Sequence, residues 1–411
     1  MIKFFNNSKY RTFILFVLAS LPVYLFYSSI FAFAVNAPYW DDYDSILNFA
    51  NNFTGTGLKD KVNLIFSQHN EHRIAFTRLI TLASYYLTGK INFRLLVFIG
   101  NISLIGLLII FWKSAAFTKK KFLYFIPVIF ILFNVQYWGD IYFATPSISN
   151  LYVLLFAFAS LYFLEKEPGK YFLFSSVLAM LAAFTSAEGL LVFFAGLPVV
   201  IYQKKLKRIS LWACVGIACI LFYFHGYIKP PAHPSIIDSI FAHPAHTIAY
   251  LFRFLGLCCL LPLAAGILFS AYFIYLVKAR FYKQNMALIS FYLFLFLTGF
   301  AAALSRSGFD FLPSRYRIIS TLILVLSYLS FMEILPEDKA RRIFPVLLVC
   351  SILFNYFSYR SNFKYIILQK KYLTQGLNSW QENKAGLSYP DQGRASSIIS
   401  GAIARGLYSL R

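Results

Sequence analysis

The segment FRLLVFIGNISLIGLLIIFWKSAAFTKKK, residues 93–121, decides the fold class of this chain. Its first part, residues 93–112, is an apolar run of about 20 residues, the length that an α-helix needs to cross the hydrocarbon core of a bilayer. Lys119, Lys120 and Lys121 follow closely behind this run. A run of this length followed by a basic cluster is typical of a transmembrane helix that ends on the cytoplasmic side.

The composition of the whole chain supports the same interpretation. Of the 411 residues, 59% are hydrophobic and only 13% are charged, whereas a soluble domain carries about 25% charged residues. We therefore predict an all-α polytopic membrane protein with about eleven transmembrane helices. The expected apolar runs are residues 12–35, 93–112, 122–137, 150–164, 171–186, 188–202, 209–227, 248–277, 285–304, 317–335 and 343–358.

The net charge of +22 raises the question of a nucleic-acid partner. The basic residues, however, occur in short clusters between the apolar runs, as the cytoplasmic loops of membrane proteins do. We therefore expect membrane lipids as partners and no nucleic acid. The clusters include residues 119–121, 204–208, 278–280 and 341–342.

The segment Ile74–Leu87 decides which loops share a side of the membrane. It has about 14 residues, short for a span, and it contains Arg78 and Thr81. If this segment does not cross the membrane, half of the 38 basic residues fall in cytoplasmic segments. If it does cross, the later basic clusters move to the outer side, which contradicts the positive-inside rule. We predict an interfacial helix within a large first outer loop, residues 36–92.

Two further features concern the domain organisation. We expect one transmembrane domain, residues 1–358, followed by a polar periplasmic tail or small cap, residues 359–411. The five cysteines all lie in apolar runs, and none has metal-ligand spacing in a loop, so we expect neither a zinc site nor a structural disulfide.

Three acidic residues, Asp41, Asp42 and Asp44, follow the first apolar run. Carboxylates this close raise one another's pKa unless cations or a metal ion compensate them. Helix capping is the alternative role, although a cap needs only one such residue. The cluster is therefore a candidate for acid–base chemistry.

The segment Gln68–Arg73 gathers His69, Glu71, His72 and Arg73. The two histidines are three residues apart and share a face if the segment is helical, but the spacing matches no familiar metal motif. The alternative is a solvated start of the interfacial helix.

Arg306, Arg315 and Arg317, with Tyr316, lie on a late outer loop. Arginine binds phosphate through two parallel hydrogen bonds, and outward arginines run against the positive-inside trend. An anionic substrate explains them; anchoring to lipid head groups is the alternative. Asp140 and Glu188 occupy other outer helix ends and are further candidates.

These residues resemble a bacterial member of the GT-C superfamily of integral membrane glycosyltransferases. The resemblance is carried by Asp41-Asp42 after the first helix, by Asn70-Glu71-His72-Arg73 with Arg78-Leu79, and by Ser314-Arg315-Tyr316. The eleven-helix layout, the large first outer loop and the outward tail are also similar.

The resemblance implies a GT-C fold in the bacterial inner membrane, with the active site facing the periplasm or exterior. It implies an inverting enzyme that moves a sugar from a polyprenyl-phosphate carrier to a cell-envelope glycan such as lipopolysaccharide, to a lipid or to a protein. Asp41 or Asp42 would act as the base. The substrate and its phosphate would be bound by Arg306, Arg315, Tyr316, Arg317, Arg73, His72 and Glu71, with Asp44, His69, Asp140 and Glu188 as other candidates.

We expect no required cofactor besides the lipid-linked donor, although a divalent metal ion is compatible with the acidic cluster. Two other classes compete. An O-antigen polymerase or ligase uses a diphosphate-linked donor and usually carries its large outer loop late in the chain. A transporter or flippase of lipid-linked sugars needs polar residues deep in its spans and discontinuous helices.

Overall fold

The computed structural model describes residues 8–117, 121–166, 169–230, 237–308 and 311–410. Lys3, Lys119 and Lys120 of the basic clusters lie outside these ranges. Within them the chain is a bundle of helices with one short antiparallel hairpin, β1 (Gln68–His69) and β2 (His72–Arg73). The all-α fold class is therefore confirmed.

Seven helices of the described part are long and apolar enough to cross a membrane. They are α2 (Ser8–Phe33), α6 (Phe93–Ser114), α9 (Ala144–Leu164), α12 (Leu206–Phe224), α15 (Met286–Arg306), α16 (Arg317–Ile334) and α17 (Glu337–Asn383). Shorter apolar helices are α7 (Lys121–Leu132), α10 (Gly169–Ala183), α11 (Leu191–Tyr202) and α14 (Pro262–Lys278). These helices make the chain a multispanning membrane protein, while the count of eleven spans stays a prediction.

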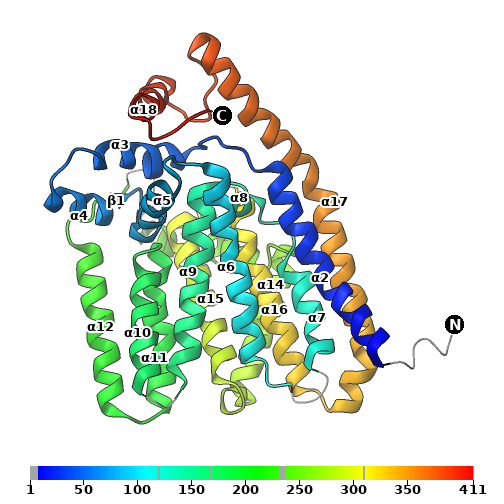
Figure 1. The fold of residues 1–411 in the computed structure, drawn as a ribbon. Coiled ribbons are helices and arrows are strands. Elements are labelled where there is room, and N and C mark those ends of the chain that lie inside the picture. Colours follow the sequence, from blue (N-terminus) through cyan, green and yellow to red (C-terminus); the bar gives the residue numbers. More distant parts are fainter. Residues whose placement is uncertain (1–7, 118–120, 167–168, 231–236, 309–310, 411) are drawn as a thin grey trace.

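The bundle has two different ends (Figure 1). At the upper end, short helices form a layer across the bundle, and the short loops between the long helices form the lower end. The layer comprises α3 (Phe49–Phe53), α4 (Leu58–Phe66), α5 (Ala75–Thr88) and α18 (Gln392–Ala404).

Helix α5 covers the segment Ile74–Leu87 and lies in the upper layer. The flanking helices show that the chain does not cross here. The side chain of Arg94, at the start of α6, donates to the carbonyl of Phe31, at the end of α2, over 2.9 Å. Because α2 ends where α6 begins, the loop between them starts and finishes at the upper end, as the charge pattern predicts.

The loops with basic clusters meet at the lower end. The amide of Ala116 donates to Glu333 over 2.9 Å, and Asn285 donates to the carbonyl of Ser114 over 2.9 Å. Gln203 donates to the carbonyl of Leu164 over 2.8 Å. The first two contacts join three loops and the third joins two others, and the charge pattern assigns all five loops to one side. Which side of a membrane this is stays a prediction.

Sequence-local signals explain where several helices begin. The side chains of Asn92 and Asn285 accept hydrogen bonds from the amides of Leu95 and Leu288, so each caps an apolar helix. Gly89, at φ 75°, ends α5 in the left-handed conformation that glycine adopts at little cost.

Small residues let the central helices approach closely. A Cβ on Gly100 of α6 would lie 2.3 Å from the hydroxyl oxygen of Ser147 on α9. Deeper in the core, the rings of Phe158 and Phe291 stack 4.5 Å apart. Close packing at small residues is typical of helices that associate within a membrane, where no hydrophobic force drives them together.

Two expected segments differ from the structure. The run 248–277 is not one helix: it is divided into α13 (Pro244–Leu255) and α14. Cβ atoms on Gly256 and Gly266 would overlap the backbone of the other helix, so this close contact needs glycine at both positions. The expected boundary at residue 358 falls inside α17, which continues to Asn383, so the polar tail begins within a continuous helix.

The remaining short elements connect the helices. The tight turn expected around Thr185–Gly189 is present as η2 (Ala187–Leu190) between α10 and α11. The others are η1 (Tyr43–Asn48), α8 (Trp138–Ile141), η3 (Asp238–Ala242), η4 (Phe281–Lys283) and η5 (Ser314–Tyr316). Most of the candidate site residues lie in or next to these elements.

Candidate functional site at the upper end

A strained turn carries the first acidic cluster. Trp40 has φ 44°, which is unfavourable for a bulky residue, and it is immediately followed by Asp41. The amide of Trp40 donates to the carbonyl of Ser388 over 2.9 Å, so the C-terminal segment holds this turn. The π-helical segment η1 comes directly after it. Backbone strain and π-helical turns both concentrate at functional sites.

Asp42 points into the protein. It is 1% exposed, and its carboxylate accepts from the amide of Thr145 at 2.8 Å, the hydroxyl of Thr145 at 2.6 Å and the amide of Tyr39 at 3.1 Å. Burial raises the pKa of Asp42 to about 6, although these hydrogen bonds oppose the rise. Since it is buried and accepts three hydrogen bonds from the protein, Asp42 braces the turn against α9 and is poorly placed to act as a base.

Asp41 faces the loop hairpin instead. Its Oδ1 accepts a hydrogen bond from the side-chain amide of Asn70 at 3.1 Å and lies 3.7 Å from Nε2 of His69. Burial alone would raise the pKa of Asp41. The net effect is a lowered pKa, because His69 contributes both a hydrogen bond and charge, Arg315 contributes charge, and Asn70 contributes a hydrogen bond. Asp41 is therefore ionised at neutral pH and partly accessible, as a base requires.

The β1–β2 hairpin brings the second cluster to Asp41. His69 pairs with His72 across the hairpin, and Asn70 occupies its turn at φ 49°. Asparagine tolerates this left-handed conformation better than most residues. The segment is thus a tight hairpin rather than the helix that the three-residue histidine spacing would need.

His72 and Glu71 form a connected polar network. Nδ1 of His72 accepts from the amide of Ala187 at 3.1 Å, so the proton lies on Nε2, which is 3.3 Å from Oε1 of Glu71. Burial lowers the pKa of His72, against the nearby charge of Glu188, and favours the neutral ring. Glu188 itself accepts from the hydroxyl of Ser186 over 2.5 Å.

Arg306 joins this network from the late outer loop, at the end of α15. Its guanidinium forms an ion pair with Glu71 and lies 5.9 Å from the ring centre of Tyr316. The first outer loop and the late loop, 235 residues apart in the chain, therefore share one charged cluster.

Arg315 has no ion-pair partner among the described residues. Its backbone packs on Gly139, where a Cβ would come within 3.3 Å of the Arg315 amide. Its guanidinium is 5.5 Å from the ring centre of Tyr316, and its charge acts on the carboxyl groups of Asp41 and Asp140. A half-buried cation in this position is suited to bind an anion.

Asp140 is a second buried carboxyl group near Arg315. It is 0% exposed; Oδ1 accepts from Asn150 over 2.8 Å, and Oδ2 has no hydrogen-bond partner in the described part of the chain. Burial raises the pKa of Asp140 well above its usual range, despite the Asn150 bond and the charge of Arg315.

Three predicted site residues make contacts within the protein. Arg73 donates to the carbonyls of Phe66, Tyr223 and His225, so its guanidinium is not free for phosphate. Arg317 points to α17, where it donates to Asn362 over 3.5 Å. Asp44 accepts from Tyr389 and Arg394, each over 2.6 Å, and so holds the C-terminal segment.

Two contributors were not predicted from the sequence. Asn70 orients Asp41, and Ser186 lies between His72 and Glu188. Asn70 stands next to the predicted His69 and Glu71, so an asparagine before a short extended segment was a usable turn signal. Among the described residues, no group of three or more His, Cys, Asp or Glu side chains is arranged to hold a metal ion.

Comparison of the chain with known protein families, with curated proteins and with solved structures gives no match. The functional argument therefore depends on the geometry and chemistry of this site.

Proposed function

We propose that this protein is a membrane glycosyltransferase of the GT-C type, which transfers a sugar from a polyprenyl-phosphate carrier to a hydroxyl group of an envelope glycan, lipid or protein. The observation that carries the proposal is that Asp41, an ionised and partly exposed carboxylate, feels the charge of Arg315, a cation without an ion-pair partner among the described residues. Both belong to the upper end of the bundle.

The two groups suit the two halves of the transfer. As the acceptor oxygen bonds to the anomeric carbon, its proton moves to the Asp41 carboxylate, and the bond from that carbon to the phosphate oxygen breaks. The bonding electrons leave with the polyprenyl phosphate, whose negative charge Arg315 stabilises. Phosphate is a good leaving group and needs positive charge rather than a proton donor. Attack opposite the departing phosphate inverts the anomeric carbon.

The neighbouring network would position these groups. Arg306 is neutralised by Glu71, and the neutral ring of His72 fixes the hairpin to the turn at Ala187. Asn70, held in the hairpin turn, donates to Asp41.

Buried amides in the spans favour the enzyme over a transporter. Asn101 donates to the carbonyls of Val97 and Ile141, and Asn355 donates to those of Phe130 and Phe133. These amides serve helix packing, whereas a transporter needs polar groups that face a pathway. A polymerase or ligase would share the chemistry but use a diphosphate-linked donor.

The test is transfer by the purified protein in proteoliposomes. Polyprenyl-phosphate-linked sugars are supplied with envelope glycolipid acceptors, and polyprenyl-diphosphate-linked sugars form a second arm. We expect transfer from the monophosphate donor and a loss of about 10²–10⁴-fold in Asp41→Asn.

Asp60→Asn is the matched control, because Asp60 is an exposed acid of the same loop on α4. It should retain full activity. Transfer from the diphosphate donor alone would identify the polymerase or ligase class, and full activity of Asp41→Asn would disprove the proposed base.

A further inference from the structure

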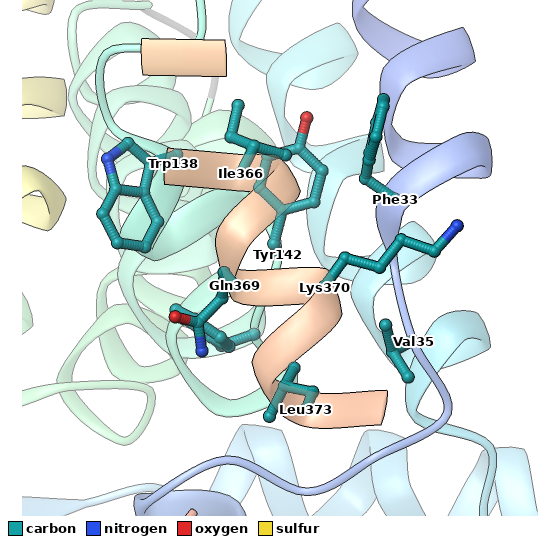
Figure 2. A pocket seen from close by; sticks show the side chains of 9 residues that line it. Phe33, Val35, Trp138, Tyr142, Ile366, Gln369, Lys370 and Leu373 are labelled. Carbon is teal, nitrogen blue, oxygen red and sulfur yellow. The ribbon is translucent and has the colours of Figure 1, made fainter. Parts of the chain in front are cut away.

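The space between α2 and α17 at Trp138 is too small for a ligand (Figure 2). It has room for about one water molecule. A chemically reactive pair of side chains lies elsewhere, in the turn between α13 and α14. This pair consists of Cys258 and Cys259, which are free thiols and do not belong to the charged cluster.

The two thiol groups of this pair meet. Cys258 and Cys259 are adjacent in the chain, and their sulfur atoms lie 3.8 Å apart. Adjacent side chains point to opposite faces of a strand and do not face each other on a helix. Here the chain turns, because the amide of Cys259 donates to the carbonyl of Gly256 over 3.0 Å and the next helix begins only at Pro262. The turn therefore brings together two thiols that regular secondary structure would separate.

The two thiols differ in their access to the surroundings. Cys258 is buried, whereas Cys259 is partly exposed and is followed by the fully exposed Leu260. The rate of thiol–disulfide exchange depends on access to the attacking sulfur. Cys259 is therefore the thiol that an oxidant meets first, and Cys258 lies behind it as the resolving thiol.

The pair lies close to the upper end of the bundle. The Cys258 side chain lies beside the hydroxyl group of Ser320, and it interacts electrostatically with Arg317, the first residue of α16. The charge pattern predicts that this end faces the outside, where disulfides form and persist more readily than in the cytoplasm. We therefore expect the pair in a compartment that favours oxidation.

We propose that Cys258 and Cys259 form a reversible disulfide between adjacent residues. Structural disulfides usually join residues whose Cα atoms are about 4.4–6.8 Å apart, whereas adjacent Cα atoms are only about 3.8 Å apart. The ring is therefore strained and easily reduced, as labile disulfides are. The proposal does not rest on the proposed glycosyl transfer.

The oxidant is a disulfide compound, and the reaction has two exchange steps. The Cys259 thiolate attacks one sulfur of the oxidant, so that a mixed disulfide forms and the first oxidant thiol leaves. The Cys258 thiolate then attacks the Cys259 sulfur, so that the ring closes and the second oxidant thiol leaves. The two cysteines lose two electrons to the oxidant, and their two protons end on the two released thiols.

The experiment uses the purified full-length protein and the small disulfide oxidant dithiodipyridine. After removal of the oxidant, the protein is unfolded in N-ethylmaleimide, digested and analysed by mass spectrometry. We expect the peptide that contains Cys258 and Cys259 to lose two hydrogen atoms and to take up no maleimide. Treatment with dithiothreitol should restore the uptake of two maleimides.

Cys214 and Cys219 are the matched control, because they lie five residues apart on α12, one exposed and the other buried. Each should carry its own maleimide or pyridylthio group, without a bond between them. Cys258→Ser and Cys259→Ser should each abolish the loss of two hydrogen atoms. In the wild-type protein, separate adducts on Cys258 and Cys259, a pair that stays reduced, or a disulfide between two copies of the chain would overturn the proposal.

Discussion

Asp41 and Asp42 are neighbours in the chain but have opposite surroundings. Asp42 is fully buried among three donors, while Asp41 accepts from Asn70 beside His69 and feels the charge of Arg315. The pKa of Asp42 is raised to about 6 and that of Asp41 is lowered. At the residue scale, therefore, the sequence limits the candidates for the catalytic base to Asp41 and Asp42. The surroundings of these two carboxylates favour Asp41.

The phosphate role of Arg315 predicts sensitivity to a conservative change. Arg315→Lys keeps the charge but loses the planar pair of donors that matches phosphate. We expect weaker binding of polyprenyl phosphate, by about 1–3 kcal/mol, the range for charge-assisted hydrogen bonds. The measurement is binding of polyprenyl phosphate to purified wild-type and variant proteins.

Arg341→Lys serves as the control, because Arg341 is exposed at the lower end of the bundle. It should bind as the wild type does. Wild-type affinity in both Arg315→Lys and Arg315→Ala would show that Arg315 only anchors the loop.

The lowered pKa of Asp41 predicts the shape of the pH–activity profile. The ordinary pKa of aspartate is about 4, so a lowered pKa keeps the Asp41 carboxylate ionised below that pH. The rate of transfer should therefore not fall through protonation of Asp41 between pH 5 and 8. Asn70→Gly preserves the left-handed turn but removes the amide donor to Asp41. Since that bond lowers the pKa, its loss should move the acid limb of kcat/KM to higher pH.

Asn52→Gly provides the comparison, because Asn52 is an exposed asparagine of the same loop that does not contact Asp41. It should leave the limb in place. An acid limb that does not move in Asn70→Gly would contradict the assignment of this limb to Asp41.

At the scale of elements, the C-terminal segment holds the turn that presents Asp41. Ser388 accepts from the Trp40 amide, and Tyr389 and Arg394 donate to Asp44. Helix α18 also reaches the first loop through the bond from Asn51 to the carbonyl of Ile398. The segment that reads as a polar tail is thus part of the support of the candidate site.

This support predicts an effect of changes far from Asp41. The double variant Tyr389→Phe with Arg394→Ala removes two donors from Asp44. We expect a loss of about 1–2 kcal/mol in docking of the segment, because the donor of one bond is an uncharged hydroxyl group and the other bond is half-exposed. Limited proteolysis should then cut after Asn383 more readily, and transfer should fall.

Glu382→Ala, at an exposed position of α17, should change neither property. If the double variant resists proteolysis as the wild type does, the two bonds do not hold the segment.

At the scale of the whole molecule, the two ends of the bundle should face opposite compartments. In a cysteine-free background, a membrane-impermeant maleimide added outside should label Asp60→Cys and Glu382→Cys. It should spare Lys207→Cys and Lys339→Cys, because these positions lie in the first turns of α12 and α17, within basic clusters. Each position is exposed, so labelling reports the compartment.

Detergent-solubilised protein, in which all four positions should react, gives the control. Labelling of the lower-end positions alone in intact cells would invert the orientation and put the candidate site in the cytoplasm.

The sequence by itself determined the membrane class, the helical fold and the meeting of the first and late loops at one end. These follow from the length of apolar runs and the distribution of Lys and Arg, both of which act locally along the chain. The break between α13 and α14, the long α17 and the division of labour among the clustered residues were decided only by the tertiary structure. Arg73 and Arg315 look alike in sequence, but Arg73 donates to carbonyl groups that the distant residues Tyr223 and His225 bring to it, whereas Arg315 has no ion-pair partner among the described residues.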